Sequence, residues 1–433
     1  MVELFVGIDW GWSTHTVCIV DSSDKKVLEC EVAHRGEDVL LFVERLQKLA
    51  GGDLSHVAAS MESPHGVMVE VLLERGVATY SLNPKQLDRF RDRHSGAGAK
   101  DDDLDAYVLA TSLRTDPKLF REITLPSEQR LQLAAYSRSY EALTEQVLAT
   151  ANQIRQLLVR YYPQMLELGD WHRERWLWEL FEAAPTPALT ASPTPTHPQG
   201  LSAQKVGAIL KEHRIRRHDP KAVLSSLRAT PLPVAAGVAQ ACATQIRILL
   251  PLLRTAESQR RECTKSMTAL LQEFQKQGTQ TEGNEPQSPE QTHHDAAILL
   301  SLPGIGVHNG AVMLTEASSA LQQRDYQALR RLAGVAPVSR RTGGRSKAPH
   351  VLQRQACCRR LREATYHWGR VAAQTDPNTR QHYAQLRQRG HSHGRAIRGV
   401  VDRLLKVLVA MLRAARVYDP ARRPGSQISE LAA

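Results

Sequence analysis

The sequence predicts an α/β domain with a mixed sheet at its N-terminal end, then a long helical region and a mainly helical, basic C-terminal domain. Over residues 1–125, short apolar runs typical of strands alternate with helical periodicity. From residue 128 onward, apolar residues recur at helical spacing over long stretches. Residues 321–433 carry 23 Lys and Arg against 6 Asp and Glu, a net charge of +17, whereas residues 1–320 carry −6.

The N-terminal domain is expected to span residues 1–125. Its strands are predicted at 4–9, 15–20, 26–32, 56–61 and 78–82. Its helices are predicted at 37–49, at 66–74, from residue 84 onward and at 103–113. Three consecutive strands followed by alternating helices and strands describe a mixed sheet flanked by helices. This order is the one expected of a ribonuclease-H-like fold.

Residues 126–293 are predicted to form a helical region. Its two long helical stretches, 128–168 and 203–277, are separated by a proline-rich linker at 183–200. A polar linker follows at 278–293. The two stretches could pair as a coiled coil or pack as a bundle, and we interpret their apolar stripes as scaffold.

The C-terminal domain is expected at 294–420, ahead of a frayed tail at 421–433. It contains the sequence Leu302-Pro303-Gly304-Ile305-Gly306 between helical segments, which has the shape of a helix-hairpin-helix turn. Gly304 and Gly306 would let backbone N–H groups approach a nucleic-acid phosphate closely. A plain connection between two helices is the alternative. His367 and Trp368 lie in a helical pattern and are interpreted as core residues.

The six cysteines include no CxxC pair and no metal-ligand spacing. Adjacent Cys357 and Cys358 lie in a helical pattern and are poorly placed to bridge each other. The simplest interpretation is a reduced, cytoplasmic protein with buried thiols. No signal peptide is expected, because Glu3 and Asp9 interrupt the start of the chain. No apolar run approaches the roughly 20 residues that span a bilayer, so we expect no membrane partner.

The basic C-terminal block indicates a polyanionic partner, because Lys and Arg release condensed counterions when they bind nucleic acid. Most of its charges are Arg, which pairs bidentately with phosphates and guanine edges. The alternative is a basic surface that only keeps the protein soluble.

Four carboxylates are candidates for a metal site. Asp9 ends the first predicted strand, and Glu62 directly follows the strand at 56–61. Asp102 and Asp105 lie three residues apart at the start of a predicted helix, which places both on one face. If the two strands are neighbours, the four groups converge and need hard divalent cations, Mg²⁺ or Mn²⁺. Two such ions about 4 Å apart stabilise the attacking and leaving oxygens in phosphodiester displacement.

Each acid taken alone also fits an ordinary structural role. An Asp after a strand is commonly a turn residue, and acids at a helix start commonly complement the helix dipole. Their joint placement in the predicted strand order favours the metal site.

Six short sequence blocks add a family resemblance. Three lie in the N-terminal domain: Gly7-Ile8-Asp9, Met61-Glu62-Ser63 and residues 100–106. Three lie in the C-terminal domain: residues 302–306, Gly334-Val335-Ala336-Pro337 and Tyr366-His367-Trp368. In this order, and over nearly the whole chain, they resemble the DEDD transposases of bacterial insertion sequences.

The resemblance implies a RuvC-like N-terminal domain, a coiled-coil insert and a C-terminal transposase domain. It places the family's acidic tetrad on Asp9, Glu62, Asp102 and Asp105. It also implies that the chain acts on DNA, both element ends and target, with a structured guide RNA (a bridge RNA) encoded by its own element. A homo-oligomer, dimer or tetramer, and a nucleoid-associated location in the bacterial cytoplasm follow from the same resemblance.

The family also carries a serine in its tail domain that is thought to attack DNA, in a basic-x-Ser-Gly context after the Gly-x-x-Pro block. The matching stretch here is 340–347, and Thr342 takes the position of that serine. A threonine hydroxyl can attack phosphorus, but its branched β-carbon is more crowded and stiffer. Ser346 is the second candidate and Ser339 the third. Alternatively, this loop only binds the phosphate backbone through its basic residues Arg340, Arg341, Arg345 and Lys347.

Two classes of function fit these features. The first is an enzyme, a transposase or site-specific recombinase that exchanges DNA strands through the acidic tetrad and a tail hydroxyl. A RuvC-like junction nuclease belongs to the same class, but it needs neither the helical insert nor the second domain. The second class is a catalytically impaired nucleic-acid-binding protein derived from such a transposase. Thr342 in place of serine keeps this class open, and the presence of all four acids argues against it.

Overall fold

The computed structural model describes residues 2–62, 66–94, 101–190, 200–277, 291–340 and 350–420. The chain folds as two compact units, Met1–Ser127 and Glu128–Ala433. The first unit ends two residues beyond the expected limit of the N-terminal domain. The second contains both the helical region and the C-terminal helices.

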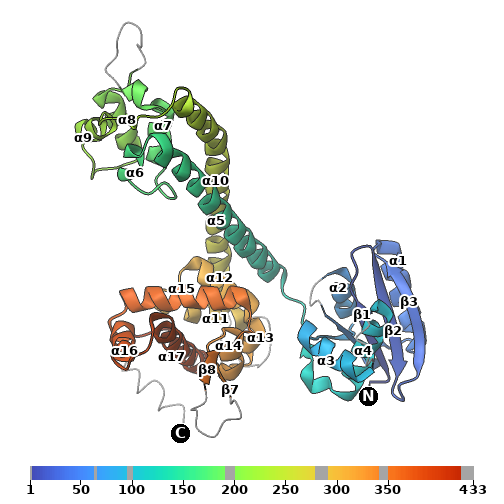
Figure 1. Ribbon diagram of the computed structural model, residues 1–433. Helices are drawn as coiled ribbons and strands as arrows, with labels where there is room; N and C mark the ends of the chain where they lie inside the picture. Colours follow the sequence, from blue (N-terminus) through green and yellow to red (C-terminus); the bar gives the residue numbers. More distant parts are fainter. Residues whose placement is uncertain are drawn as a thin grey trace. The chain divides into compact units, whose positions relative to one another are not determined.

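The N-terminal unit is built on a six-stranded sheet with the order β3-β2-β1-β4-β5-β6 (Figure 1). Its strands are β1 (Leu4–Asp9), β2 (Thr14–Asp21), β3 (Lys26–Ala33), β4 (Val57–Met61), β5 (Ala78–Ser81) and β6 (Arg121–Glu122). The β1–β4 and β4–β5 pairs are parallel, and the other three pairs are antiparallel. This mixed sheet confirms the predicted ribonuclease-H-like fold class. Only β6 was not predicted, because two residues are too short to show a periodicity.

Different helices cover the two faces of this sheet (Figure 1). They are α1 (Gly36–Leu49), α2 (Val67–Glu74), α3 (Pro84–His94) and α4 (Asp102–Thr115). Val6 and Ile8 of β1 pack with α1 and α2 on one face. Phe5 packs with α3 and α4 on the other. Because successive side chains of a strand alternate between faces, Gly7 lies on the α4 face as well.

The second unit begins with two long helices, α5 (Glu128–Tyr161) and α10 (Val238–Gln277), that pack against each other in opposite directions (Figure 1). Four shorter helices surround the end of the pair where α5 ends and α10 begins. They are α6 (Gln164–Glu167), α7 (Arg175–Ala183), α8 (Ala203–Glu212) and α9 (Pro220–Leu227). The first predicted helical stretch therefore ends early, next to Pro163. The second is interrupted between α8 and α9, and again between α9 and α10, where the expected break near Pro231 and Pro233 lies.

The remaining elements form a second helical core at the other end of the pair. They are α11 (Gln291–Leu300), α12 (Val307–Glu316), α13 (Ser318–Gln322), α14 (Tyr326–Leu332), β7 (Pro337–Arg340), β8 (His350–Gln353), α15 (Arg359–Thr375), α16 (Pro377–Gln388) and α17 (His393–Arg413). Leu133 of α5 and Met267 of α10 are buried in this core. The expected boundary at 293/294 therefore crosses a shared core, and α11 begins inside the predicted polar linker.

Three smaller findings complete the comparison with the sequence. The β7–β8 hairpin was not predicted, and its two strands flank the part of stretch 340–347 that follows Arg340. All six cysteines are free thiols, but only Cys18, Cys242 and Cys263 are buried, so the expectation of buried thiols holds for three of them. Cys357 and Cys358 precede α15 and do not lie within a helix. Among the described residues, no helix is both long enough and apolar enough to cross a membrane.

Candidate functional site

Asp9 and Glu62 lie at the ends of two neighbouring parallel strands. Ile8 of β1 is paired in register with Met61 of β4, so Asp9 and Glu62 are the next residues at the same edge of the sheet. Neighbouring strands are about 4.8 Å apart. Both side chains are half-buried. The two strands are neighbours, as the predicted convergence of the carboxylates requires.

Strand alternation turns Asp9 toward α4. Gly7, two residues earlier, lies directly under that helix: a Cβ at Gly7 would stand 1.9 Å from the carbonyl oxygen of Ala106. On β4, the Ser60 hydroxyl donates to the carbonyl oxygen of Leu109 at 3.0 Å, so the α4 face of this strand is the one that Glu62 continues. Gly7 is thus needed because only glycine lets α4 pack this closely on β1.

The first turn of α4 lies at the same edge as Asp9. The opposite end of the helix contacts the β2–β3 turn, where the Thr111 hydroxyl donates to Asp24 at 2.6 Å and Arg114 pairs with Asp24 at 3.1 Å. That turn lies at the Leu4 end of β1, because Leu4 pairs with Asp21. The start of α4, with Asp102 and Asp105, is therefore directed to the edge that carries Asp9 and Glu62.

Asp105 is bound by an arginine that the sequence did not single out. Arg91 of α3 donates from Nε to Oδ1 at 2.5 Å and from Nη2 to Oδ2 at 2.6 Å. The Asp105 side chain is only 3% exposed and that of Arg91 15%. Asp102, one turn earlier, is exposed. Nothing in the sequence distinguishes Arg91 from Arg89 and Arg93 on the same helix.

The acids offer hard oxygen donors, the kind that Mg²⁺ and Mn²⁺ prefer. Within the described part of the chain, however, no three His, Cys, Asp or Glu side chains are close enough together to hold a metal ion. Both oxygens of Asp105 accept hydrogen bonds from Arg91, so this carboxylate is not available as a metal ligand. Asp9, Glu62 and Asp102 fit the donor chemistry of a divalent site, and Asp105 fits it only if Arg91 moves away.

Two exposed tryptophans follow Asp9 directly. Trp10 is 43% exposed and Trp12 86%, and their rings meet edge to face with centroids 6.2 Å apart. The Trp10 Nε1 lies 3.8 Å from where a Cβ of Gly66 would stand, so Trp10 borders the N-cap of α2. The other four tryptophans, Trp171, Trp176, Trp178 and Trp368, are buried.

The predicted nucleophile loop lies almost entirely outside the described residues. This applies to both hydroxyl candidates, Thr342 and Ser346, and to Arg341, Arg345 and Lys347. Ser339 and Arg340 are the last residues of β7, and their backbones pair with Val351 and His350 of β8. The hairpin therefore brings the two ends of segment 341–349 together.

The glycines of the 302–306 turn differ in their surroundings. Gly304 has a φ of +75°, and a Cβ there would stand 2.7 Å from the backbone nitrogen of Ala372, so it is required for packing against α15. Gly306, the N-cap of α12, has nothing within 4 Å of that position. Trp368 is fully buried and donates to the carbonyl oxygen of Pro303 at 3.0 Å, so it belongs to the core as predicted. The same prediction was wrong for His367, which is exposed because the neighbouring position on α15 points away from the core.

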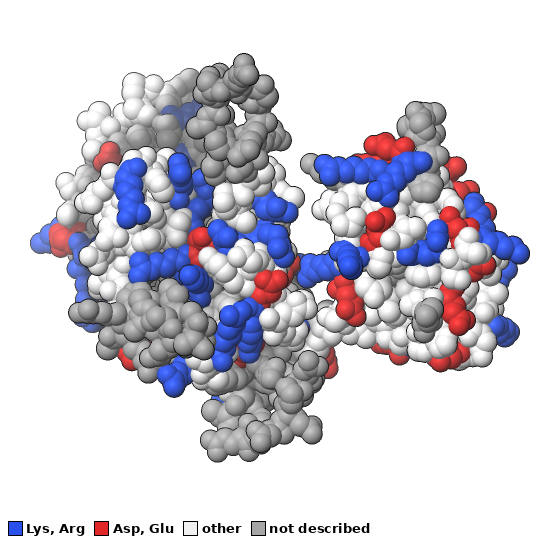
Figure 2. Space-filling model, turned by 90° about the horizontal axis from the view of Figure 1, so that it is seen from below, with Lys and Arg blue, Asp and Glu red and all other residues white. Residues whose placement is uncertain are grey.

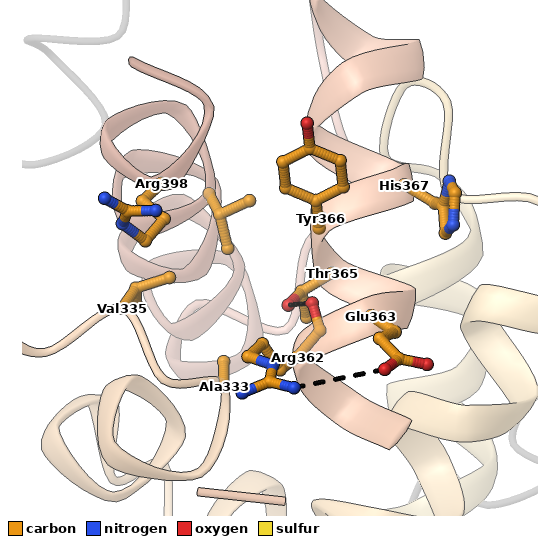
Figure 3. A pocket seen from close by; sticks show the side chains of 9 residues that line it. Ala333, Val335, Arg362, Glu363, Thr365, Tyr366, His367 and Arg398 are labelled. Atoms are coloured by element: carbon orange, nitrogen blue, oxygen red, sulfur yellow. Dashed lines mark hydrogen bonds and ion pairs between the residues drawn. The ribbon is translucent and has the colours of Figure 1, made fainter. Parts of the chain in front are cut away.

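A cavity of about 190 Å³ lies between α15 and α17, next to the segment that leads into β7 (Figure 3). We call it the α15–α17 pocket. Its polar lining includes Arg362, Tyr366 and His367 of α15 and Arg398 of α17. Lys and Arg outnumber Asp and Glu on the face of the second unit seen in Figure 2, whereas the N-terminal unit shows both signs.

Comparisons with known proteins agree with this architecture. A family model for the DEDD domain of IS110, described as transposase, matches residues 6–163, and a model described as transposase IS116/IS110/IS902 family matches residues 296–384. A putative transposase, y4uE, of Sinorhizobium fredii is 37% identical over half of this chain and 58% of its own length. The mini-circle putative transposase for IS117 of Streptomyces coelicolor is 29% identical over 97% of this chain and 96% of its own length. An uncharacterized 42 kDa protein of insertion element IS900 from Mycobacterium paratuberculosis is 26% identical over 96% of this chain and 98% of its own. This chain belongs to the IS116/IS110/IS902 family of transposases.

Proposed function

We propose that this transposase cuts and rejoins DNA strands with four carboxylates, Asp9, Glu62, Asp102 and Asp105, and with a hydroxyl of loop 340–347. One observation supports the proposal most. Asp9 and Glu62 end paired parallel strands at one edge of the sheet, and the first turn of α4 is directed to that edge. Mg²⁺ or Mn²⁺ held there would stabilise the oxygens that gain charge at the scissile phosphate.

The residues of the chain have separate parts in this scheme. Asp9 and Glu62 would hold the ions at the strand ends, and Asp102 would contribute from the exposed start of α4. Arg91 competes with the ions for Asp105, so the full set of four ligands forms only when Arg91 withdraws. The Trp10–Trp12 pair lies immediately beside this edge.

The hydroxyl of Thr342, or of Ser346, would attack phosphorus and form a new O–P ester to the 5′ phosphate. The bond from phosphorus to the 3′ oxygen breaks, and the proton of the hydroxyl ends on the released 3′ hydroxyl. One phosphodiester replaces another, so the step needs no external energy source. Arg340, Arg341 and Arg345 would neutralise charge in the transition state.

The partners follow from the same proposal. The basic second unit would bind the backbones of DNA and of a structured guide RNA. A homo-oligomer would supply more than one set of these groups to a strand exchange. This chemistry would take place at the nucleoid, in the bacterial cytoplasm.

A second candidate function has two observations in its favour. The close Arg91–Asp105 pair and Thr342 in place of serine both fit a nucleic-acid-binding protein that has lost strand exchange. A junction nuclease that only cuts is the intermediate case.

One experiment separates the three. The full chain is incubated with element-end DNA and Mn²⁺, and covalent protein–DNA adducts are trapped by denaturation. We expect adducts from the unaltered chain and none from the Asp9→Asn or Glu62→Gln variant. Loss in Thr342→Ala alone assigns the hydroxyl to Thr342, and loss in Ser346→Ala alone assigns it to Ser346. Cleavage without adducts would leave a metal nuclease, and neither product would leave a binding protein.

A further inference from the structure

The α15–α17 pocket has an excess of positive charge. Arg362 and Arg398 enter it from two different helices (Figure 3). Glu363 is the one carboxylate in its lining, and its Oε1 accepts from Arg359 at 2.9 Å but stands 4.0 Å from Arg362. The hydrogen bond from Arg362 to the Cys357 sulfur is also long, at 3.9 Å. A guanidinium has five donors, so these weak contacts leave Arg362 able to bind an anion.

Charged groups next to the pocket increase its excess of positive charge. Burial, with Arg395 as the second cause, lowers the pKa of Arg398. Burial and then Arg370 lower the pKa of His367. Both shifts have the direction produced by desolvated positive charge, which an anion in the pocket would offset.

The aromatic and apolar part of the lining suits a flat ring. Tyr366 is half-buried and lies on α15 across from Arg398 of α17 in Figure 3, and Val335 and Val401 belong to the same lining. Its ring meets His393 edge to face, with centroids 6.4 Å apart. Such a contact holds the orientation of the Tyr366 ring. Base–aromatic stacking is the usual way in which proteins hold unpaired nucleotides.

The pocket also lies next to the hairpin that leads to the predicted nucleophile loop. Gly334 has a φ of +66°, and a Cβ there would stand 3.0 Å from the Cys357 sulfur and 3.4 Å from Cδ of Arg362. This close approach fixes Val335, two residues before β7. The four residues of β7 then extend about 13 Å, at roughly 3.3 Å per residue.

We propose that the α15–α17 pocket binds one nucleotide of an unpaired DNA strand, with its phosphate between Arg362 and Arg398 and its base against Tyr366. The identification of DNA as the strand rests on the proposed function, because the hydroxyl loop must reach a DNA phosphate.

The test is equilibrium binding of the full chain to a fluorescein-labelled oligothymidylate of about 16 nucleotides, in EDTA so that no cleavage occurs. Arg362→Gln and Arg398→Gln should each weaken binding and lower the slope of log Kd against log salt by about 0.7. Arg387→Gln is the matched control, an exposed arginine of α16 that does not line the pocket, and should leave the slope unchanged. Tyr366→Leu should weaken binding by about fivefold or more without changing the slope, and Tyr366→Phe should not.

Three further probes make the assignment specific. On an abasic strand of equal length, Tyr366→Leu should cost nothing, because no base remains to stack. On duplex DNA, all the pocket variants should bind like the unaltered chain. Unchanged salt slopes, equal losses on duplex, or losses confined to an RNA strand of the same sequence would overturn the proposal. Because no metal or cleavage is involved, a failure here leaves the carboxylate chemistry standing, and normal binding without adducts would refute only that chemistry.

A different observation supports a second inference. Among the described residues Trp12, at 86%, is the most exposed large hydrophobic side chain, and the Trp10–Trp12 pair follows Asp9 directly at the edge of Asp9 and Glu62. Its flat rings offer stacking surfaces to a partner. We infer that Trp10 and Trp12 stack on an unpaired base next to the phosphate that the carboxylates act on. This inference also rests on the proposed function.

Tryptophan fluorescence tests it, because the four other tryptophans are buried and acrylamide reaches them poorly. Saturating oligothymidylate in EDTA should protect the emission of the full chain from acrylamide quenching. Trp12→Leu should remove most of that protection and weaken binding about fivefold or more, whereas an abasic strand should give none even to the unaltered chain. Equal quenching with and without oligothymidylate, or equal protection by the abasic strand, would overturn it. Neither of these results bears on the proposed strand exchange, which adduct formation tests separately.

Discussion

Replacing Arg91 with methionine removes the guanidinium from Asp105 and keeps much of its apolar stem. Asp105 is left with a buried carboxylate, 3% exposed, that has lost two hydrogen bonds of 2.5 and 2.6 Å. Removing one partner of a buried ion pair costs about 3–5 kcal/mol. Arg93→Met is the control: its pair with Asp116 is 63% and 35% exposed, and an exposed pair contributes about 1 kcal/mol at most.

Hydrogen exchange of the amides of β1 and α4, measured in the full chain, reports this loss locally. A loss of 3–5 kcal/mol makes exchange roughly two to four orders of magnitude faster. The decisive comparison is the protection that Mg²⁺ gives to Arg91→Met and to the unaltered chain, because Arg91 and the ion compete for the Asp105 carboxylate. At about 100 times its Kd, Mg²⁺ should return about 2.7 kcal/mol to Arg91→Met and clearly less to the unaltered chain at the same concentration. Equal protection of the two proteins by Mg²⁺, or none in either, would refute the competition.

Three further outcomes follow from single sites. Gly7→Ala should cost about 3 kcal/mol or more in unfolding free energy, since its Cβ would stand 1.9 Å from the backbone of α4, whereas Gly36→Ala, with nothing within 4 Å, should cost nothing in the same denaturation series. Burial holds the pKa of His15 below 6.5 in the folded chain, so the unfolded chain takes up the proton more readily. Stability of the N-terminal unit should be complete above pH 6.5 and fall below it, and His15→Gln should flatten that dependence in exchange measurements. Thr342→Ser should speed adduct formation about two- to tenfold, because serine lacks the stiff branched β-carbon and the cost of one unfavourable rotamer corresponds to about that factor in rate. A slower rate would speak against Thr342 as the nucleophile.

Much of the N-terminal fold could be predicted from the sequence because its buried strands are short apolar runs between clear turns. The positions of Asp9 and Glu62 at strand ends followed from those runs. Their convergence did not, because only the parallel register of Ile8 with Met61 brings them together. The Arg91–Asp105 pair was beyond prediction, since it joins two helices through side chains on faces that no periodicity marks.

The second unit was harder to predict for similar reasons. Its long helices were visible as apolar stripes, but the core shared by Leu133 and Met267 joins residues far apart in the chain. The four-residue strands of the β7–β8 hairpin carry too little alternation to be recognised. The α15–α17 pocket combines Arg362 with Arg398 from separate helices, and nothing local in the sequence links them.

The central claim, that the strand-end carboxylates hold a divalent metal, is tested most directly by Mn²⁺ binding to the full chain, followed by electron paramagnetic resonance. We expect saturable Mn²⁺ binding that is lost in Asp9→Asn and in Glu62→Gln. It should be retained in Asp92→Asn, which removes an exposed acid of α3. Loss of binding in both strand-end variants, with the control intact, is the predicted result. Binding that survives both substitutions, or an unaltered chain that binds no Mn²⁺, would contradict the claim.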